Sequence, residues 1–443
     1  MPGTASYSPS ETQLTVSVAN YPHYSVKIAA EPDLTVRIYE YQDVYAPPGR
    51  LPPIKSVTDY AVSRTIMRAS SEPFDAMLQG GWMESRTTIV ELKENDWIMS
   101  LAMEIWFRAF HGVPMTEECY KADVAVVWSL VRAGNMWKLK REGLIKWFSD
   151  WFKECWERNK GKDLGKSMGG MGGMGGRGAK LAQVILYPCW AFDHAPGFAA
   201  ATKWLVYNSA SHITEFNPTK HRDLHLPKRI IQQLNAARGR LKAVMHDILW
   251  TPIERPLKYA TCDCKEITLF LYQKALLDVS VWPLERTFSH TSITGLLGRL
   301  EAFKYKSEHK PCSSCEIRCE EVVKNTIREV SGYFDGLCLV CMALTEPGAP
   351  HDADWYYWNH DKIKDWDRGC RGRGVKHGQP TWFYSYMSAT YHKDARENWY
   401  KLRRFDHEPN VFGTDIFDDD FSATGFSAPD FAAPDFAATS FYG

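Results

Sequence analysis

AVSRTIMRASSEPFDAMLQGGWMESRTTIVEL, from Ala61 to Leu92, is the stretch that decides the fold of the first part of this chain. Its apolar residues recur at helical spacing after residue 63. Gly80-Gly81 then ends the helical pattern, because glycine readily adopts the left-handed conformation needed at a helix C-terminus. Residues 88–92 alternate and include β-branched side chains, which is typical of a strand. The stretch therefore predicts a strand, two helices and a second strand.

The composition of the chain limits the classes of protein to which it can belong. Its 443 residues are enough for two or three domains, and 44% hydrophobic residues exclude a wholly disordered chain. The 53 basic and 53 acidic residues balance, so no global field draws the chain to nucleic acid or to an anionic membrane. The N-terminus lacks the pattern of a signal peptide, and no stretch approaches the ~18 apolar residues of a membrane span. We therefore expect a cytoplasmic or nuclear protein.

Changes in composition divide the chain into seven segments. Residues 1–30 are polar, although alternation at 14–18 and 24–28 allows an edge strand there. The run MGGMGGMGGRG predicts a flexible linker rather than a phosphate-binding loop, because the Gly-Lys-Ser/Thr ending is missing. The expected organisation is a leader (1–30), a first domain (31–158), the linker (159–180), a helical region (181–308), a cysteine-rich segment (309–345), an aromatic and histidine-rich region (346–408) and a disordered Phe/Asp tail (409–443).

Apolar periodicity predicts a series of helices beyond the first strands. The aromatic residues between Leu144 and Trp156 indicate a core helix, with a partner groove as the alternative. A long helix that includes Ile230 is expected to stop at Pro252, because proline lacks the backbone N–H donor, and Ser292 is expected to cap a later helix. Between them, one helix has the apolar face Ile267, Phe270, Leu271 and Leu277.

The first domain resembles the BTB/POZ family over residues 33 to about 156. The matching segments are DLTVRI, VSRTIMRASSEPFDAML, GGWMES and IVELKENDWIMSLAMEIWFRAFHG, in the family's order of elements. Ser71, Phe74, Met77, Leu78, Glu84 and Ser85 stand where the family pattern has such residues. Two departures are Val131–Gly134, in place of the family's A-D-K-Y, and a proline-rich loop at 42–56. Both are similar to the larger filamentous-fungal BTB proteins, as is the GLCLVC sequence at 336–341.

The resemblance and the periodicity together give an α+β fold class. We expect an N-terminal BTB/POZ-like α/β domain, then a mostly α-helical region with a zinc-stapled segment, then the disordered tail. The resemblance implies a non-catalytic protein-interaction scaffold or adaptor that forms a homodimer or binds a cullin. The alternative is a transcription or chromatin regulator in which the basic segment Asp367–Lys376 contacts nucleic acid. The balanced charge of residues 309–345 argues against nucleic acid as a partner.

The cysteines predict a metal site rather than disulfides, because we expect a reducing compartment. Five of the 11 cysteines lie in the cysteine-rich segment and include two C-x-x-C pairs. Four thiolates at about 2.3 Å form a structural zinc site. The expected ligands are Cys312, Cys315, Cys338 and Cys341, with His309 as an alternate fourth ligand. The competing interpretation is a set of reduced, buried cysteines.

The other cysteines and histidines are interpreted as structural. Cys262 and Cys264 are too close to chelate one ion unless a loop intervenes, and Cys319 is a spare thiol. Isolated cysteines are expected to act as small hydrophobic residues: Cys119, Cys155, Cys189 and Cys370. Four histidines could join Cys370 in a second site, but surface positions are the expectation: His351, His360, His377 and His392. Because no G-x-S-x-G, H-E-x-x-H or Walker pattern appears, we do not expect an enzyme.

Overall fold

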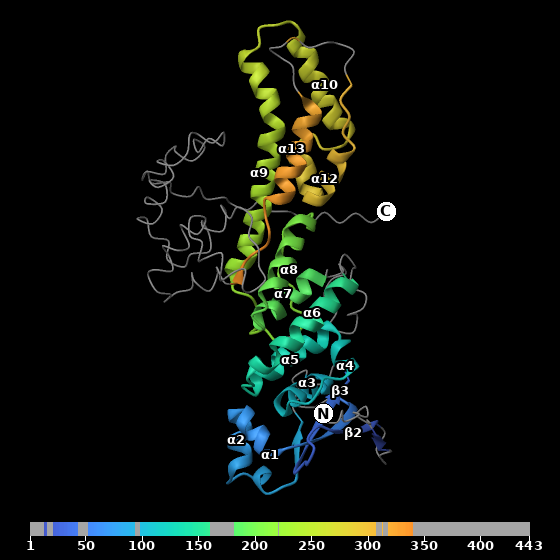
Figure 1. The fold of residues 1–443 in the computed structure, drawn as a ribbon, viewed down its shortest axis with the longest axis vertical. Helices are drawn as coiled ribbons and strands as arrows, with labels where there is room; N and C mark the ends of the chain where they lie inside the picture. Colours follow the sequence, from blue (N-terminus) through green and yellow to red (C-terminus); the bar gives the residue numbers. More distant parts are fainter. Residues whose placement is uncertain are drawn as a thin grey trace, which may run out of the picture. The chain divides into compact units, whose positions relative to one another are not determined.

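The computed structural model describes residues 13–15, 21–42, 52–93, 98–159, 181–219, 221–306, 312 and 318–339 (Figure 1). This part of the chain is mixed α+β, with one sheet near the N-terminus followed by many helices. Residues 160–180 of the predicted linker, the aromatic and histidine-rich region and the Phe/Asp tail lie outside the described residues.

The sheet contains five strands in the order β1-β2-β4-β3-β5. The strands are β1 (Gln13–Thr15), β2 (His23–Lys27), β3 (Leu34–Tyr41), β4 (Ile54–Val62) and β5 (Ile89–Leu92). β3 and β4 are antiparallel, whereas β2 pairs in parallel with β4 and β5 in parallel with β3. β2 falls at the alternating residues of the predicted leader, so the strand that was the alternative interpretation there does form.

The two faces of the sheet differ in chemistry. Leu34, Val36 and Ile38 alternate along β3 and are buried on one face. On the other face, Arg37 donates to both carboxylate oxygens of Asp59 across the strand pair, at 2.7 and 2.8 Å. The core of the domain therefore lies on the apolar side of the sheet.

The predicted order over residues 61–92 is confirmed. β4 leads into α1 (Arg64–Ser70) and α2 (Glu72–Gln79), and a short 3-10 helix (Met83–Ser85) precedes β5. The Ser71 hydroxyl caps α2 by accepting from the Phe74 N–H at 3.2 Å, and it also lies 2.6 Å from the Trp137 carbonyl oxygen. Gly80 and Gly81 have φ of 142° and 89°, a conformation that favours glycine.

The helices α3 (Ser100–His111), α4 (Glu117–Tyr120) and α5 (Val124–Met136) follow the sheet. Gly134 was expected near the end of its helix but lies inside α5. The reason is packing: the Trp106 ring of α3 lies against Gly134, and its indole N–H donates to the Leu130 carbonyl at 3.0 Å.

The aromatic residues predicted to form a core do so. A short 3-10 helix (Arg141–Leu144) leads into α6 (Ile145–Asn159), and the indoles of Trp147 and Trp151 are buried and donate to backbone carbonyls at 3.2 and 2.8 Å. The core continues past residues 160–180 into α7 (Leu181–Ala191) and α8 (Ala195–Asn208). The Trp128 indole of α5 donates to the Val184 carbonyl at 2.8 Å, and the Phe148 and Phe192 rings stack with centroids 4.5 Å apart.

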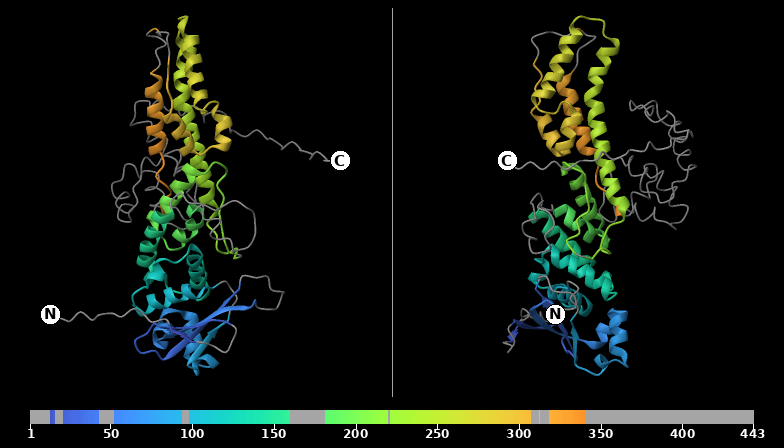
Figure 2. Two further views of the ribbon diagram at one scale, coloured as in Figure 1. Left: turned by 90° about the vertical axis from the view of Figure 1, so that its right-hand side faces the viewer. Right: turned by 180° about the vertical axis from the view of Figure 1, so that it is seen from behind.

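The later helices are α9 (Lys228–Tyr259), α10 (Cys264–Asp278), α11 (Leu284–His290), α12 (Ile293–Glu301) and α13 (Cys319–Gly332). α9 and α13 lie side by side, and α10 also packs on α9 (Figures 1 and 2). The predicted stop at Pro252 is wrong, because α9 runs through Pro252 to Tyr259. Leu249 and Ile253 are both buried there, and their packing outweighs the hydrogen bond that proline removes. The predicted cap at Ser292 is confirmed, since its hydroxyl accepts from the Gly295 N–H.

The predicted apolar face of α10 is the exposed one. Phe270 is 60% exposed and Leu277 56% exposed, while Leu276 is fully buried. The buried side of the helix consists of Thr268, Leu269, Tyr272, Ala275 and Leu276. α10 is therefore apolar on two sides, and only one side packs on the rest of the described chain.

Candidate metal centre

Three cysteines that are distant in the sequence converge in the helical region. Cys262 lies in the turn between α9 and α10, Cys264 is the first residue of α10, and Cys312 precedes α13. Their three sulfur atoms all lie within 4.8 Å of one another, and each residue is partly exposed. This cluster could hold a metal ion.

The turn between α9 and α10 places two of the three sulfurs. α9 ends at Tyr259, and the Ala260 N–H still donates to the Pro256 carbonyl at 3.0 Å. The Lys265 N–H then reaches back to the Cys262 carbonyl at 3.4 Å, which closes a tight turn around Asp263. This turn brings together two cysteines whose spacing would be too short for chelation on an extended chain.

The electrostatics at Cys264 and Cys312 favour negatively charged sulfur. Cys264 opens α10, where the free N–H groups and the helix dipole stabilise a thiolate. The Cys312 backbone N–H donates to the Cys264 sulfur at 3.4 Å. N–H donors of this kind orient metal-bound thiolates and stabilise their charge.

The distances suit a sulfur tetrahedron. Zinc–sulfur bonds of about 2.3 Å place the sulfurs of a tetrahedral site roughly 3.8 Å apart. The observed upper limit of 4.8 Å allows this spacing after a small contraction, and none of the three cysteines is in a disulfide. Three thiolates without a carboxylate in the cluster suit a soft or borderline ion such as zinc better than magnesium or calcium.

The residues predicted as ligands are only partly described. Cys312 belongs to the cluster, whereas Cys315, Cys341 and His309 lie outside the described residues, so the predicted four-ligand set stays a prediction. Cys338 is described and fully buried, and it is not part of the cluster. The neighbouring Leu337 N–H donates to the Thr202 hydroxyl of α8 at 2.9 Å, which fixes this segment against α8.

Gly336 explains why the GLCLVC sequence begins with glycine. Its φ of 100° favours glycine, and a Cβ there would overlap the Ala199 carbonyl of α8. In the described residues, the first half of this sequence therefore serves packing against α8.

The sequence analysis missed Cys262 and Cys264 as partners of Cys312. The C-x-C spacing was seen, but the turn that makes it useful depends on where α9 ends, and that end was placed at Pro252. The C-x-C pair, taken together with the C-x-x-C pair 48 residues after Cys264, is the signal that could have found the site.

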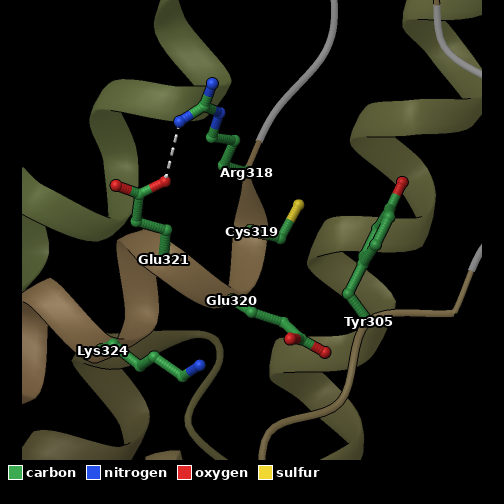
Figure 3. Close-up of a pocket in the computed structure, with 6 residues that line it drawn as sticks. All are labelled: Tyr305, Arg318, Cys319, Glu320, Glu321 and Lys324. Carbon is green, nitrogen blue, oxygen red and sulfur yellow. Dashed lines mark hydrogen bonds and ion pairs between the residues drawn. The ribbon is translucent and has the colours of Figure 1, made fainter.

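A hollow of about 530 Å³ opens at the start of α13 (Figure 3). It is lined by Tyr305, Arg318, Cys319, Glu320, Glu321 and Lys324, and Arg318 pairs with Glu321 at 3.4 Å. Burial raises the pKa of Cys319 to about 12. Cys319 is therefore a neutral thiol near pH 7, unlike a metal-binding thiolate.

Several other expected features can be placed. Cys119, Cys155 and Cys189 are buried, as expected for small hydrophobic residues. Cys370, its four candidate histidines and the basic segment Asp367–Lys376 lie outside the described residues. In the part of the chain that the structure describes, none of the helices has the length and apolar character to span a bilayer.

Comparisons with known proteins give no relative for this chain. No protein-family model matches it, and no curated protein or solved structure is similar to it.

Proposed function

We propose that this chain is a non-catalytic protein-binding scaffold. Its exposed apolar surface carries the proposal. Ile267, Phe270 and Leu277 lie on one face of α10 and are exposed, although a helix that is apolar all round is normally buried. Exposed apolar patches of this kind mark protein-interaction sites in soluble proteins.

The N-terminal domain supports the same function through its resemblance to the BTB/POZ family. The order of elements from β3 to α3 agrees with the family order. Ser71 and Phe74 also have local roles that the S-x-x-F pattern requires: the serine caps α2, and the buried phenylalanine stacks on Trp137 with centroids 4.9 Å apart. A domain of this family would provide a homodimer interface or a cullin-binding surface.

Exposed aromatic and apolar side chains also occur on the N-terminal domain. Trp82 and Met83 are exposed in the segment between α2 and β5, and Ile89 is exposed on β5, which is an edge strand of the sheet. Large apolar side chains next to a sheet edge are typical of protein-binding surfaces. The scaffold would then have one binding surface on each of its two regions.

The test is a comparison of purified full-length chains. The wild type, a Trp82→Ser/Met83→Ser variant and a Phe270→Ser/Leu277→Ser variant are examined by sedimentation, by pull-down of a purified cullin and by quantitative affinity purification. We expect self-association or a partner in near-stoichiometric amount, and loss of it in at least one variant. A wild-type chain that sediments as a monomer and retains no protein above the background of an unrelated bait contradicts the proposal.

The metal ion of this scaffold is zinc, and its role is structural. A cluster that contains only thiolates matches structural zinc sites, whereas catalytic zinc sites leave one position open for water. Chelation of the ion should lower the helical signal and the melting temperature of the full-length chain. Unchanged melting after complete removal of bound zinc contradicts the structural role.

A further inference from the structure

Two groups of cysteines compete for the metal ion of the helical region. One group is the C-x-C pair at the α9–α10 turn with Cys312. The other is the predicted set that joins Cys312 to Cys338. Only the first group has its sulfur atoms together in the described part of the chain.

The surroundings of Cys338 differ from those of the cluster. Cys338 is fully buried between Leu337 and Leu339, which are also buried, in a segment whose N–H at residue 337 is bound to α8. An apolar site disfavours a thiolate and leaves no path for a hydrated ion. Cys262, Cys264 and Cys312 are instead partly exposed, and an N–H group donates to one of their sulfurs.

We propose that Cys262, Cys264 and Cys312 supply three thiolates of the zinc site, and that Cys338 is a core thiol rather than a ligand. This assignment rests on the proposed structural ion. The chain spacing points to Cys315 for the fourth thiolate, because a C-x-x-C pair commonly binds one zinc ion through both of its sulfurs. Cys315 lies outside the described residues, and the experiment below tests it directly.

The site would act as a cross-link between elements that are distant in the sequence. It joins the α9–α10 turn to the segment ahead of α13, and it closes a loop of 48 residues between Cys264 and Cys312 that contains α11 and α12. Closing a long loop removes conformational entropy from the unfolded chain. The ion would therefore hold the end of α10 that meets α9 against the start of α13.

Zinc content of the full-length chain tests the assignment. Single variants Cys262→Ser, Cys264→Ser, Cys312→Ser and Cys315→Ser are compared with two matched controls at buried cysteines, Cys338→Ser and Cys189→Ser. We expect one zinc ion per wild-type chain, loss of most of it in the four cluster variants, and full retention in the controls. Loss of zinc in Cys338→Ser, with retention in Cys262→Ser and Cys264→Ser, overturns the assignment.

A second measurement does not depend on the folding of a variant. The wild-type chain is alkylated with and without a chelator, and the modified peptides are identified by mass spectrometry. Cys262, Cys264, Cys312 and Cys315 should be protected by zinc and become labelled after its removal, while Cys338 is labelled only on unfolding. Labelling of Cys262 and Cys264 at the same rate in both samples, or a disulfide between Cys262 and Cys312 in the non-reduced wild type, also overturns it.

The two proposals fail in different ways. A chain that binds its partner but has zinc at other cysteines loses the ligand assignment and keeps the scaffold function. A chain that has zinc on the three assigned thiolates but binds no partner keeps the assignment and loses the scaffold function.

Discussion

Gly134 is a single residue that determines how two helices of the N-terminal domain meet. An ideal Cβ at this position would lie 2.9 Å from the Trp106 ring, so the Gly134→Ala variant forces α3 and α5 apart. We expect a loss of about 1–3 kcal/mol in the free energy of unfolding, measured by urea denaturation.

Gly239 is the matched control for this change. It also lies inside a helix, α9, but a Cβ there meets no atom within 4 Å. Gly239→Ala should therefore raise the free energy of unfolding by about 0.5–1 kcal/mol. Equal effects of the two alanines would mean that the contact with Trp106 is unimportant.

His111 gives the N-terminal domain a pH dependence. Its Nε2 accepts from the Ser63 N–H at 2.9 Å, its Nδ1 lies 2.8 Å from the Phe107 carbonyl, and burial lowers its pKa. The unfolded chain then binds a proton at a higher pH than the folded chain does. This contribution to stability is complete above the ordinary histidine pKa of about 6.5 and is lost as the pH falls through that value toward the folded pKa.

The His111→Gln variant tests this dependence. Between about pH 7.5 and about pH 5.5 the wild type should lose more of its free energy of unfolding than the variant does. An equal loss in both chains would assign the pH dependence to other groups.

At the scale of elements, α10 separates a structural face from an exposed face. Phe270 and Leu277 are largely exposed, so their replacement by serine should change the free energy of unfolding by no more than about 0.5 kcal/mol, even where it abolishes partner binding. Leu276→Ala, on the fully buried face, should cost about 2–5 kcal/mol. Thermal unfolding of the three chains measures the difference, and a strongly destabilised serine variant would show that the exposed face supports the fold.

Sequence periodicity predicted that α10 exists but not which side of it is buried. The helix carries apolar residues on both sides, and periodicity cannot decide between two apolar faces when the neighbouring element is unknown. The end of α9 was misplaced for a related reason, because the packing of Leu249 and Ile253 overrides the local effect of Pro252. Short-range signals were sufficient at Ser71, Gly80-Gly81 and Ser292, where the cap or turn depends only on nearby backbone.

The cysteine site combines a predictable and an unpredictable part. Clustered C-x-x-C pairs predicted a metal site that includes Cys312. The residues that Cys312 meets are determined by the α9–α10 turn, which no spacing within the cysteine-rich segment could reveal.

At the scale of the molecule, the core continues across residues 160–180. The Trp128 indole donates to the Val184 carbonyl, and Phe148 stacks on Phe192. A chain cut at a protease site inserted between residues 166 and 176 should therefore elute as one species on native gel filtration. Trp128→Ala should weaken this association, and two independent peaks from the cut wild-type chain would show that the regions are separate.

The scaffold proposal requires that the helical region stay in one arrangement while its exposed face binds a partner. In this account the metal ion supplies that rigidity, because its thiolates join α10 to the segment ahead of α13.

Native mass spectrometry of the full-length chain tests this central claim most directly. We predict one zinc ion on the wild-type chain, none on Cys312→Ser, and one on the control Cys338→Ser. A wild-type chain of metal-free mass, or a Cys312→Ser chain that keeps its zinc, would contradict the account.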